Sequence, residues 1–279
     1  MSFKNKIDTA RLVQYAFIVA LALIVLAPFY VQVAYAFKSR AEVAETGLAF
    51  PRSLYLGNFA EVFADHSLVA AFLRTLLVTV VSVGILQVVS SMCAWALVRN
   101  EARRYYKVLY YLFLAAIMLP FQVVMLPLYS LFRSAGLLNT IPGLIAGICG
   151  FQLSYNVFVV CSFIKTVPVS MEEAAKIDGA GVLATFWRIV MPLLTPIMVT
   201  CLILNALSAW NDFQTAVVLA FKESVRTLQY ALYMFFGQYS AQIHQAFAAF
   251  MIAVLPIVAL YLALQRYLIS GLTSGSVKG

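Results

Sequence analysis

The chain has little charge for its length. Of its 279 residues, 63% are apolar and only 11% are Asp, Glu, Lys or Arg, whereas a soluble domain carries about 25% charged residues. So few charges leave too little polar surface to cover a globule in water, and this predicts an integral membrane protein. Several apolar runs exceed the roughly 18 residues that mark a spanning helix, and they lack the alternation of β-barrel strands.

Groups that carry chemistry are also scarce. The four cysteines lie inside apolar runs, with no CxxC pair and no histidine at ligand spacing, so we interpret them as small buried apolar residues: Cys93, Cys149, Cys161 and Cys201. The sequence has no carboxylate pair, no nucleophile–base spacing and no Walker-type glycine loop. We therefore expect no catalytic residue, no metal site and no cofactor in this chain.

The apolar runs predict six transmembrane helices, at about 12–37, 70–98, 108–131, 141–164, 192–210 and 246–264. The first is longer than the 7–15 apolar residues of a signal-peptide core, so we expect it to be retained. Pro120 and Pro127 predict kinks in the third helix, because each proline removes a backbone hydrogen bond. The predicted organisation is an N-terminus at 1–11, the first helix at 12–37, a loop with short helices at 38–69, a five-helix core at 70–269 and a tail at 270–279.

The distribution of Lys and Arg predicts the orientation in the membrane. With six spans, residues 1–11, 99–107, 165–188 and 265–279 share one side, which holds twelve Lys or Arg and five Asp or Glu. The other side, at 38–74, 131–141 and 211–245, holds seven and six. The first side is therefore predicted to be cytoplasmic, with both termini inside. The net charge of +8 reflects this orientation and indicates no nucleic-acid partner.

A charged, capped segment at 168–192 stands out among the apolar runs. Ser170 precedes Glu173 by three residues, the spacing of a capping box, and this predicts a helix from Met171 to about Asp178. Gly179 is suited to end that helix in the left-handed conformation. A second helix is predicted over 182–190. On the first helix Met171, Ala174, Ala175 and Asp178 are expected to share one face, where the alanines would allow a partner to approach closely. A loop that merely joins two spans is the alternative on physical grounds alone.

The spacing within this segment resembles a known signature. Glu173-Ala174-Ala175, three residues, Gly179, nine residues, then Ile189-x-Met191-Pro192 resembles the EAA motif of ABC importer permeases, with Met191 where leucine is usual. Further stretches are similar to the carbohydrate-uptake branch, to the subunit equivalent to the second permease of the maltose transporter: Leu119-Pro120-Phe121-Gln122, Pro127-Leu128-Tyr129, Gly136-Leu137-Leu138-Asn139-Thr140, Trp210-Asn211-Asp212-Phe213 and Gln265-Arg266-Tyr267-Leu268-x-x-Gly271-Leu272-Thr273.

The resemblance implies a type I ABC importer transmembrane fold in the bacterial inner (cytoplasmic) membrane. It also implies a second homologous permease subunit, two ATPase subunits that bind ATP and Mg, and an extracytoplasmic solute-binding protein. The segment Tyr230 to Gln245 would contact that binding protein. The EAA helix would dock on an ATPase subunit, and this makes the following residues candidates for coupling: Glu172, Glu173, Ala174, Ala175, Asp178, Gly179 and Ala180.

Polar and aromatic residues at membrane depth are candidates for a sugar path, although each is also suited to joining helices. They are Gln122, Gln152, Tyr155, Asn156, Asn205, Ser208, Trp210 and Asn211. Trp210 and Tyr155 would stack on a sugar ring, and an anchor at the membrane boundary is the alternative for Trp210.

The predicted function is a permease subunit of an ATP-driven importer, with a neutral oligosaccharide as the favoured substrate. The same machinery carrying a non-sugar, such as a glycerol phosphodiester, stays an alternative. An ion-coupled secondary transporter is a second one, but it calls for titratable groups at membrane depth, and the interiors of the predicted spans have none. A membrane-embedded enzyme is disfavoured by the missing catalytic groups.

Overall fold

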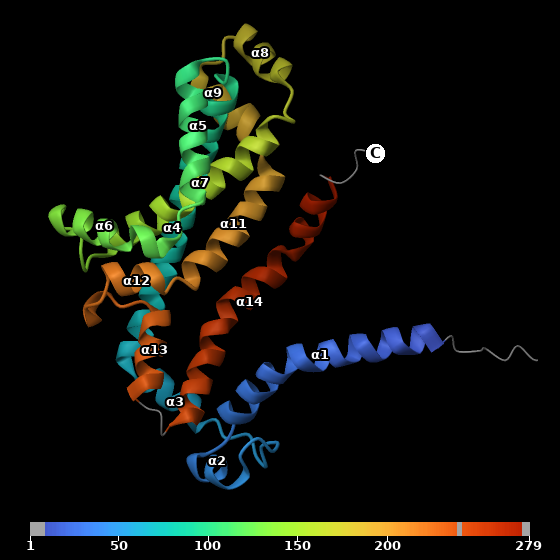
Figure 1. The fold of residues 1–279 in the computed structure, drawn as a ribbon, viewed down its shortest axis with the longest axis vertical. Coiled ribbons are helices and arrows are strands. Elements are labelled where there is room, and N and C mark those ends of the chain that lie inside the picture. The colour runs from blue at the N-terminus through green and yellow to red at the C-terminus, as the bar shows by residue number, and fades with distance from the viewer. Residues whose placement is uncertain (1–8, 239–241, 275–279) are drawn as a thin grey trace, which may run out of the picture. The chain divides into compact units, whose positions relative to one another are not determined.

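The computed structural model describes residues 9–238 and 242–274, and it contains helices and no strand over these residues. Figure 1 shows the helices and their order along the chain. They fall into two units by their internal contacts, Met1–Val69 with Leu232–Val254, and Ala70–Ala231 with Leu255–Gly279. The fold is therefore all-α, as the composition predicts.

Long apolar helices dominate the structure. Four are long and apolar enough to cross a membrane: Arg11–Ala36, His66–Arg99, Ile141–Ile164 and Ile243–Gln265. They belong to α1 (Thr9–Ala36), α4 (His66–Arg99), α7 (Ile141–Ile164) and α14 (Ile243–Ser274). Two pairs of shorter helices, each bent at a short break, are together also long and apolar enough, so the number of candidate spans reaches six if each pair is one span. The predicted total of six thus depends on two broken helices.

The first bent pair replaces the predicted third span. Helices α5 (Arg104–Ile117) and α6 (Phe121–Ser134) follow each other with a bend of 109° between their axes. Pro120 is the N-cap of α6 and has no N–H to continue the preceding helix. Pro127 lies inside α6 and does not break it. The sequence therefore located the break, but it predicted a kinked helix where the structure has two separate ones.

The second bent pair contains the continuation of the charged segment. Helix α9 (Val182–Thr185), the π-helical turn η1 (Phe186–Val190) and α10 (Met191–Leu193) form one helical stretch, which meets α11 (Thr195–Trp210) at 78°. Helix α8 (Val169–Ile177) precedes this stretch. The remaining elements are α2 (Arg40–Thr46), α3 (Gly57–Ala64), α12 (Gln214–Leu219), the 3-10 turn η2 (Glu223–Val225) and α13 (Leu228–Gln238).

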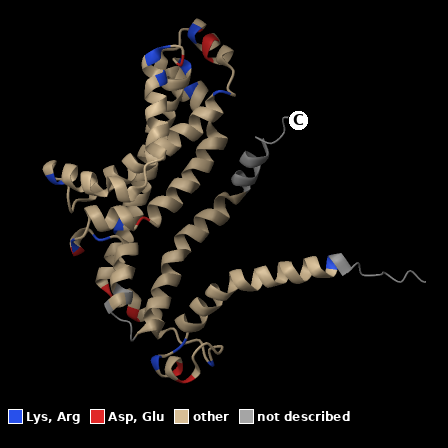
Figure 2. Ribbon diagram, viewed as in Figure 1, with Lys and Arg blue, Asp and Glu red and all other residues tan. Residues whose placement is uncertain are grey.

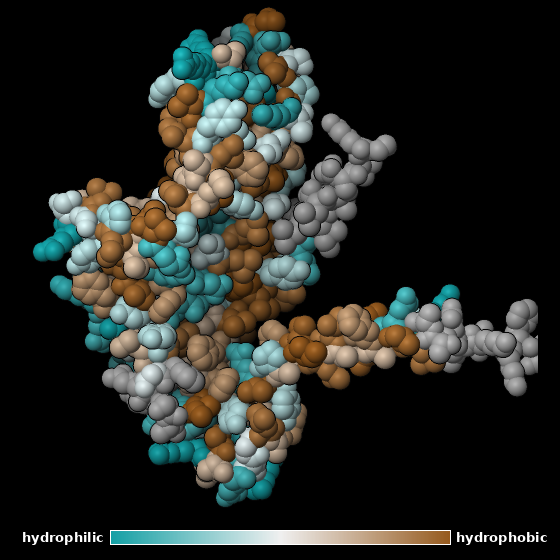
Figure 3. Space-filling model, viewed as in Figure 1, coloured by the Kyte–Doolittle hydropathy of each residue, from teal (hydrophilic) through white to brown (hydrophobic). Residues whose placement is uncertain are grey.

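Hydrogen bonds at the C-terminal end of α1 hold the first unit together. The side chain of Asn58, on α3, donates hydrogen bonds to the backbone oxygens of Ala36 and Lys38, both at 2.8 Å. Lys38 is buried, and its ammonium donates to the oxygen of Gly47 at 2.8 Å. The predicted short helices of 38–69 are present as α2 and α3. By contrast, the membrane-length part of α1 is exposed, and Figure 3 shows apolar side chains along it.

The second unit contains the larger core. One buried cluster joins α4, α7, η1 and α11 through Ala94, Leu97, Val157, Val160, Cys161, Ile164, Phe186, Val190, Leu194, Met198 and Cys201. A second joins Val78, Leu144, Ile148, Ala209, Ala216, Ala220 and Val225. Helices α7 and α11 carry no Lys, Arg, Asp or Glu, and Figure 2 shows the charges of this unit on its connections and helix ends. All four cysteines are free, two of them buried and two half-buried.

Candidate functional site

Helix α8 begins earlier than the sequence predicted. It starts at Val169, its N-cap is Pro168, and no side chain caps it. Ser170 therefore lies inside the first turn, and the predicted capping box with Glu173 is wrong. Proline at the N-cap fits this start because the first amides of a helix have no intrahelical acceptor, so a missing N–H there costs nothing.

The end of α8 agrees with the prediction. Gly179 has a φ of +84°, and its N–H donates to Lys176 O at 3.1 Å. Ala180 N donates to Ala175 O at 2.9 Å, so the two bonds close the helix as in a Schellman-type ending. A Cβ added at Gly179 would meet nothing within 4 Å. Glycine is therefore favoured here by the backbone conformation rather than by lack of space.

The exposed face of α8 differs from the predicted one. Met171, Glu173, Ala174 and Asp178 are exposed, but Ala175 is buried within the chain. Ile177, which was not among the predicted face residues, is 86% exposed. Val182 and Leu183 continue this apolar exposure onto α9. The α8–α9 turn thus presents carboxylates beside apolar side chains that are largely exposed.

Glu172 points into the chain and not outward. Its carboxylate accepts hydrogen bonds from Trp95 Nε1 at 2.9 Å and from Arg99 Nε at 2.9 Å, and Arg99 Nη2 lies 2.8 Å from the same Oε1 atom. Arg99 also donates to the oxygen of Val167 at 3.0 Å. We call this set of contacts, made by Trp95, Arg99 and Glu172, the α4–α8 latch. The expected direct contact between Glu172 and an ATPase is replaced by a contact with α4.

A cavity of about 500 Å³ collects several of the predicted path residues. Its lining comes from α6, α7, α11, the turn before α12 and the start of α12: Phe121, Ile148, Phe151, Gln152, Ser208, Asn211, Asp212, Phe213, Gln214 and Thr215. Three of these, Gln152, Ser208 and Asn211, were predicted from the sequence. The aromatic members were not predicted. Phe121 and Phe151 pack edge to face at 5.5 Å and give the cavity an apolar wall opposite amide and hydroxyl groups.

Asp212 accepts hydrogen bonds from residues in the first turn of α12. Its carboxylate accepts from Thr215 Oγ1 at 2.9 Å, from Thr215 N at 3.4 Å and from Ala216 N at 3.2 Å. Burial raises the pKa of the Asp212 carboxyl above its ordinary value, while these hydrogen bonds act in the opposite direction.

Gln152 differs from Asp212, because its side-chain oxygen is buried and has no hydrogen-bond partner among the described residues. Gln152 also lines the cavity, so its side-chain amide forms part of the polar cavity wall.

Other predicted path residues lie elsewhere. Asn156 and Asn205 are buried and donate to each other at 2.9 and 2.8 Å, so they join α7 to α11. Trp210 is only 2% exposed and packs edge to face on Phe72 at 5.4 Å, so within this chain it is neither a free stacking platform nor a boundary anchor. Gln122 and Tyr155 are exposed and do not line the cavity.

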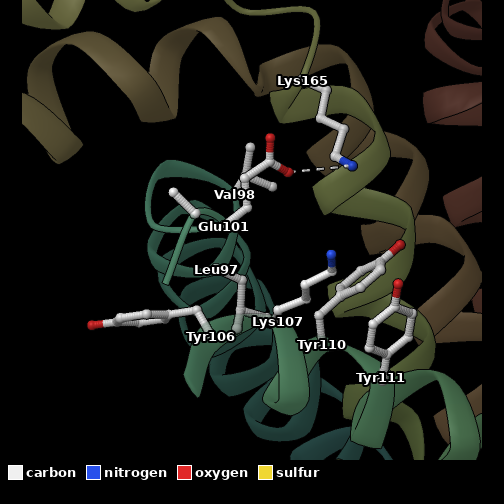
Figure 4. Close-up of a pocket in the computed structure, with 9 residues that line it drawn as sticks. Leu97, Val98, Glu101, Tyr106, Lys107, Tyr110, Tyr111 and Lys165 are labelled. Atoms are coloured by element: carbon white, nitrogen blue, oxygen red, sulfur yellow. Dashed lines mark ion pairs between the residues drawn. The ribbon is translucent and has the colours of Figure 1, made fainter. Parts of the chain in front are cut away.

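A second hollow, of about 480 Å³, lies beside the end of α4. Figure 4 shows Lys107, Tyr110 and Tyr111 from α5 around it, together with Glu101 and Lys165. Lys165 lies 3.7 Å from Glu101 Oε2 and 5.8 Å from the centre of the Tyr110 ring. Both members of the ion pair are more than half exposed, so we assign the pair little stabilising energy.

The segment predicted to meet a binding protein forms α13 and the start of α14, and its residues 239–241 lie outside the described part of the chain. The predicted tail at 270–279 continues α14 to Ser274, and 275–279 lie outside the description, as do 1–8. Among the residues that are described, no group of three His, Cys, Asp or Glu is placed to hold a metal ion.

The helices define a multi-pass membrane protein. Residues 87–274 match the model of the binding-protein-dependent transport system inner membrane component, and the chain belongs to this family of permease subunits. It is 36% identical over 253 residues to the melibiose/raffinose/stachyose import permease protein MelC of Bacillus subtilis, covering 90% of this chain and 91% of that one. It is 32% identical to the multiple sugar-binding transport system permease protein MsmG of Streptococcus mutans, covering 95% and 96%.

A solved structure shows the same fold. A chain of a bacterial ABC transporter involved in the import of the acidic polysaccharide alginate matches with a TM-score of 0.82 at 23% identity, over 96% of this chain and 99% of that one. The ABC importer permease fold predicted from the sequence is thereby confirmed.

Proposed function

We propose that this chain is one of two permease subunits of an ATP-driven, binding-protein-dependent importer for a neutral saccharide. Family membership and the saccharide permeases among its relatives support the transport role. In this proposal the chain lies in the bacterial inner membrane with α8 and both termini in the cytoplasm. It has no ATPase site of its own, and two ATPase subunits supply hydrolysis with bound ATP and Mg.

The cavity is the observation that supports a neutral saccharide as the substrate. It combines the Gln152 amide, the Ser208 hydroxyl and the Asn211 amide with aromatic walls, a combination suited to sugar hydroxyls and to the apolar faces of sugar rings. Its one charged lining residue is Asp212, with no Lys or Arg among the lining residues. An anionic substrate, such as a glycerol phosphodiester or an acidic saccharide, would be repelled by that carboxylate, so we favour a neutral one.

A comparison of two glutamines tests this assignment. Gln152→Leu removes a polar group from the cavity wall, while Gln122→Leu changes an exposed predicted path residue that does not line the cavity. We expect Gln152→Leu to lower ATP-driven uptake by about fivefold, the value of one hydrogen bond to a neutral partner, and Gln122→Leu to leave uptake near that of the unmodified complex. The measurement is uptake of labelled saccharide into proteoliposomes with ATP inside.

The substrate for that assay comes from a ligand screen on the binding protein that works with this permease. Equal uptake by the two variants would remove the cavity from the sugar path. Uptake by the chain alone, in vesicles without ATP, would instead support the ion-coupled transporter and contradict the proposed mechanism.

A further inference from the structure

The α4–α8 latch links two helices that are distant in the sequence. Helix α8 follows α7 and leads through α9 and η1 into α11, so those helices receive its motion through the chain itself. Helix α4 has no such connection, because Glu172 lies 77 residues beyond Trp95 and 73 beyond Arg99. Side-chain contacts of the latch therefore provide a route from α8 to α4 that the covalent order of the chain does not.

The latch is built as a firm attachment. Two donors from successive turns of α4 hold one carboxylate, and the guanidinium also holds the backbone at Val167. The side chains of Arg99 and Glu172 are only 17% and 3% exposed, so water screens the pair weakly. The Trp95 ring packs on Phe186 at 5.5 Å, and Phe186 is fully buried. The carboxylate and the indole thus fix both α8 and η1 to the same end of α4.

The other end of α4 is also attached to a connecting segment. Arg74 Nη1 donates to the oxygens of Glu223 and Arg226, at 2.9 and 3.0 Å. Thr75 Oγ1 accepts from Leu228 N at 2.7 Å. Arg74 and Arg99 are 25 residues apart, which is about 38 Å along a helix. Helix α4 therefore connects α8 with the η2–α13 connection at the opposite end of this unit.

We propose that Glu172 is a positioning residue for transport, and that the α4–α8 latch makes α4 move with α8. Through the bonds of Arg74 and Thr75, a displacement of α8 then reaches the η2–α13 connection, which the proposed orientation places on the extracytoplasmic side. By reciprocity, a load on that connection changes the state of α8. This inference rests on the proposed function, in which α8 docks on an ATPase subunit.

The experiment compares Glu172→Gln with Glu101→Gln in the full complex in proteoliposomes. Both changes remove one carboxylate near the end of α4, but only the first breaks the latch, because Glu101 belongs to an exposed pair. We expect Glu172→Gln to retain its ATPase subunits and to lower uptake per ATP hydrolysed by about tenfold. Its ATP hydrolysis should also respond less to the loaded binding protein. Glu101→Gln should match the unmodified complex in both measurements.

A reversible link separates coupling from folding. In an Arg99→Cys/Glu172→Cys variant without the other cysteines, a short bis-methanethiosulfonate joins the two helices, and a reductant releases them. Uptake per ATP should rise when the link forms and fall when it is reduced, in the same folded sample. No change on linking, or normal coupling in Glu172→Gln at matched amounts of complex, would overturn the inference. If the unmodified chain neither retains ATPase subunits nor takes up saccharide with ATP, the proposed function fails instead.

Discussion

Residues of the same type have different roles in this protein because their neighbours differ. Gln152 and Asn156 are one turn apart on α7, and both have amide side chains. Asn156 meets Asn205 of α11 and has its hydrogen bonds satisfied, whereas the side-chain oxygen of Gln152 has no partner among the described residues and Gln152 lines the cavity. Residues four apart lie on one face of a helix, but this spacing does not indicate which of the two faces another helix.

The asparagine pair predicts a measurable coupling energy. Asn156→Leu leaves the Asn205 amide without its partner, and Asn205→Leu has the reverse effect. We expect each single change to lower the unfolding free energy in detergent, and the double change to cost less than the sum. The expected interaction energy is about 0.6–1.7 kcal/mol, the range of hydrogen bonds between membrane helices.

The measurement is a double-mutant cycle on denaturant unfolding. Ser162→Ala serves as the control, because Ser162 is exposed and its hydroxyl bonds only to Phe158 O of its own helix. Strictly additive effects of the two asparagine changes would contradict an energetically coupled pair.

At the scale of the elements, α8 depends on a single backbone conformation at its end. Gly179→Ala places a side chain at a φ of +84°, which costs about 1–2 kcal/mol for an L-residue outside the allowed left-handed region. We expect the variant to lose a large part of its co-purifying ATPase, because the α8–α9 turn relaxes to another shape. Co-purification from membranes, relative to the amount of permease, is the measurement.

Gly181→Ala is the matched control for this change. Gly181 is two residues further along the same turn, has a φ of −70°, and a Cβ there would meet nothing within 4 Å. It should retain the ATPase fully. An equal loss in both variants would show that the turn tolerates no side chain at all, and would contradict a specific requirement for a positive φ at Gly179.

The contact between α7 and α12 depends on a close approach of the two helices at Gly147. A Cβ at Gly147 would lie 2.5 Å from Leu219 Cδ1 and 3.0 Å from Thr215 Cγ2, while a Cβ at Gly150 would meet nothing within 4 Å. We expect Gly147→Ala to lower the free energy of unfolding by about 1–3 kcal/mol, as overpacking does. It should also lower uptake, because Thr215 lines the cavity. Gly150→Ala should be neutral or slightly stabilising. Thermal unfolding of the purified complex distinguishes them.

At the scale of the whole molecule, the proposed orientation sets which surfaces meet which partners. Glu101→Cys and Glu45→Cys are suited to test it, because the two glutamate side chains are similarly exposed, at 68% and 63%. In a variant without the other cysteines, an impermeant maleimide should label residue 45 from the outside of spheroplasts. It should label residue 101 only in inverted vesicles. The opposite pattern would reverse the topology and place α8 outside.

Much of the fold was predictable from sequence, since long apolar runs and prolines act locally. The runs located α1, α4, α7 and α14, and Pro120 located the break between α5 and α6. The size of that break, 109°, was not predictable, because a missing hydrogen bond permits a bend and the packing of the surrounding helices decides its angle. For the same reason Trp210 was assigned to a surface although it is buried against Phe72.

The charged segment shows where local information ends. Residue types alone predict a short helix there that ends at Gly179, because helix propensity and backbone conformation depend on neighbouring residues. The residue spacing also resembles a family motif. That Glu172 faces inward to Trp95 and Arg99 while Glu173 faces outward depends on the packing of the folded chain. Two adjacent glutamates look alike in a sequence, and their roles diverge because the end of α4, more than seventy residues earlier, packs against one side of α8.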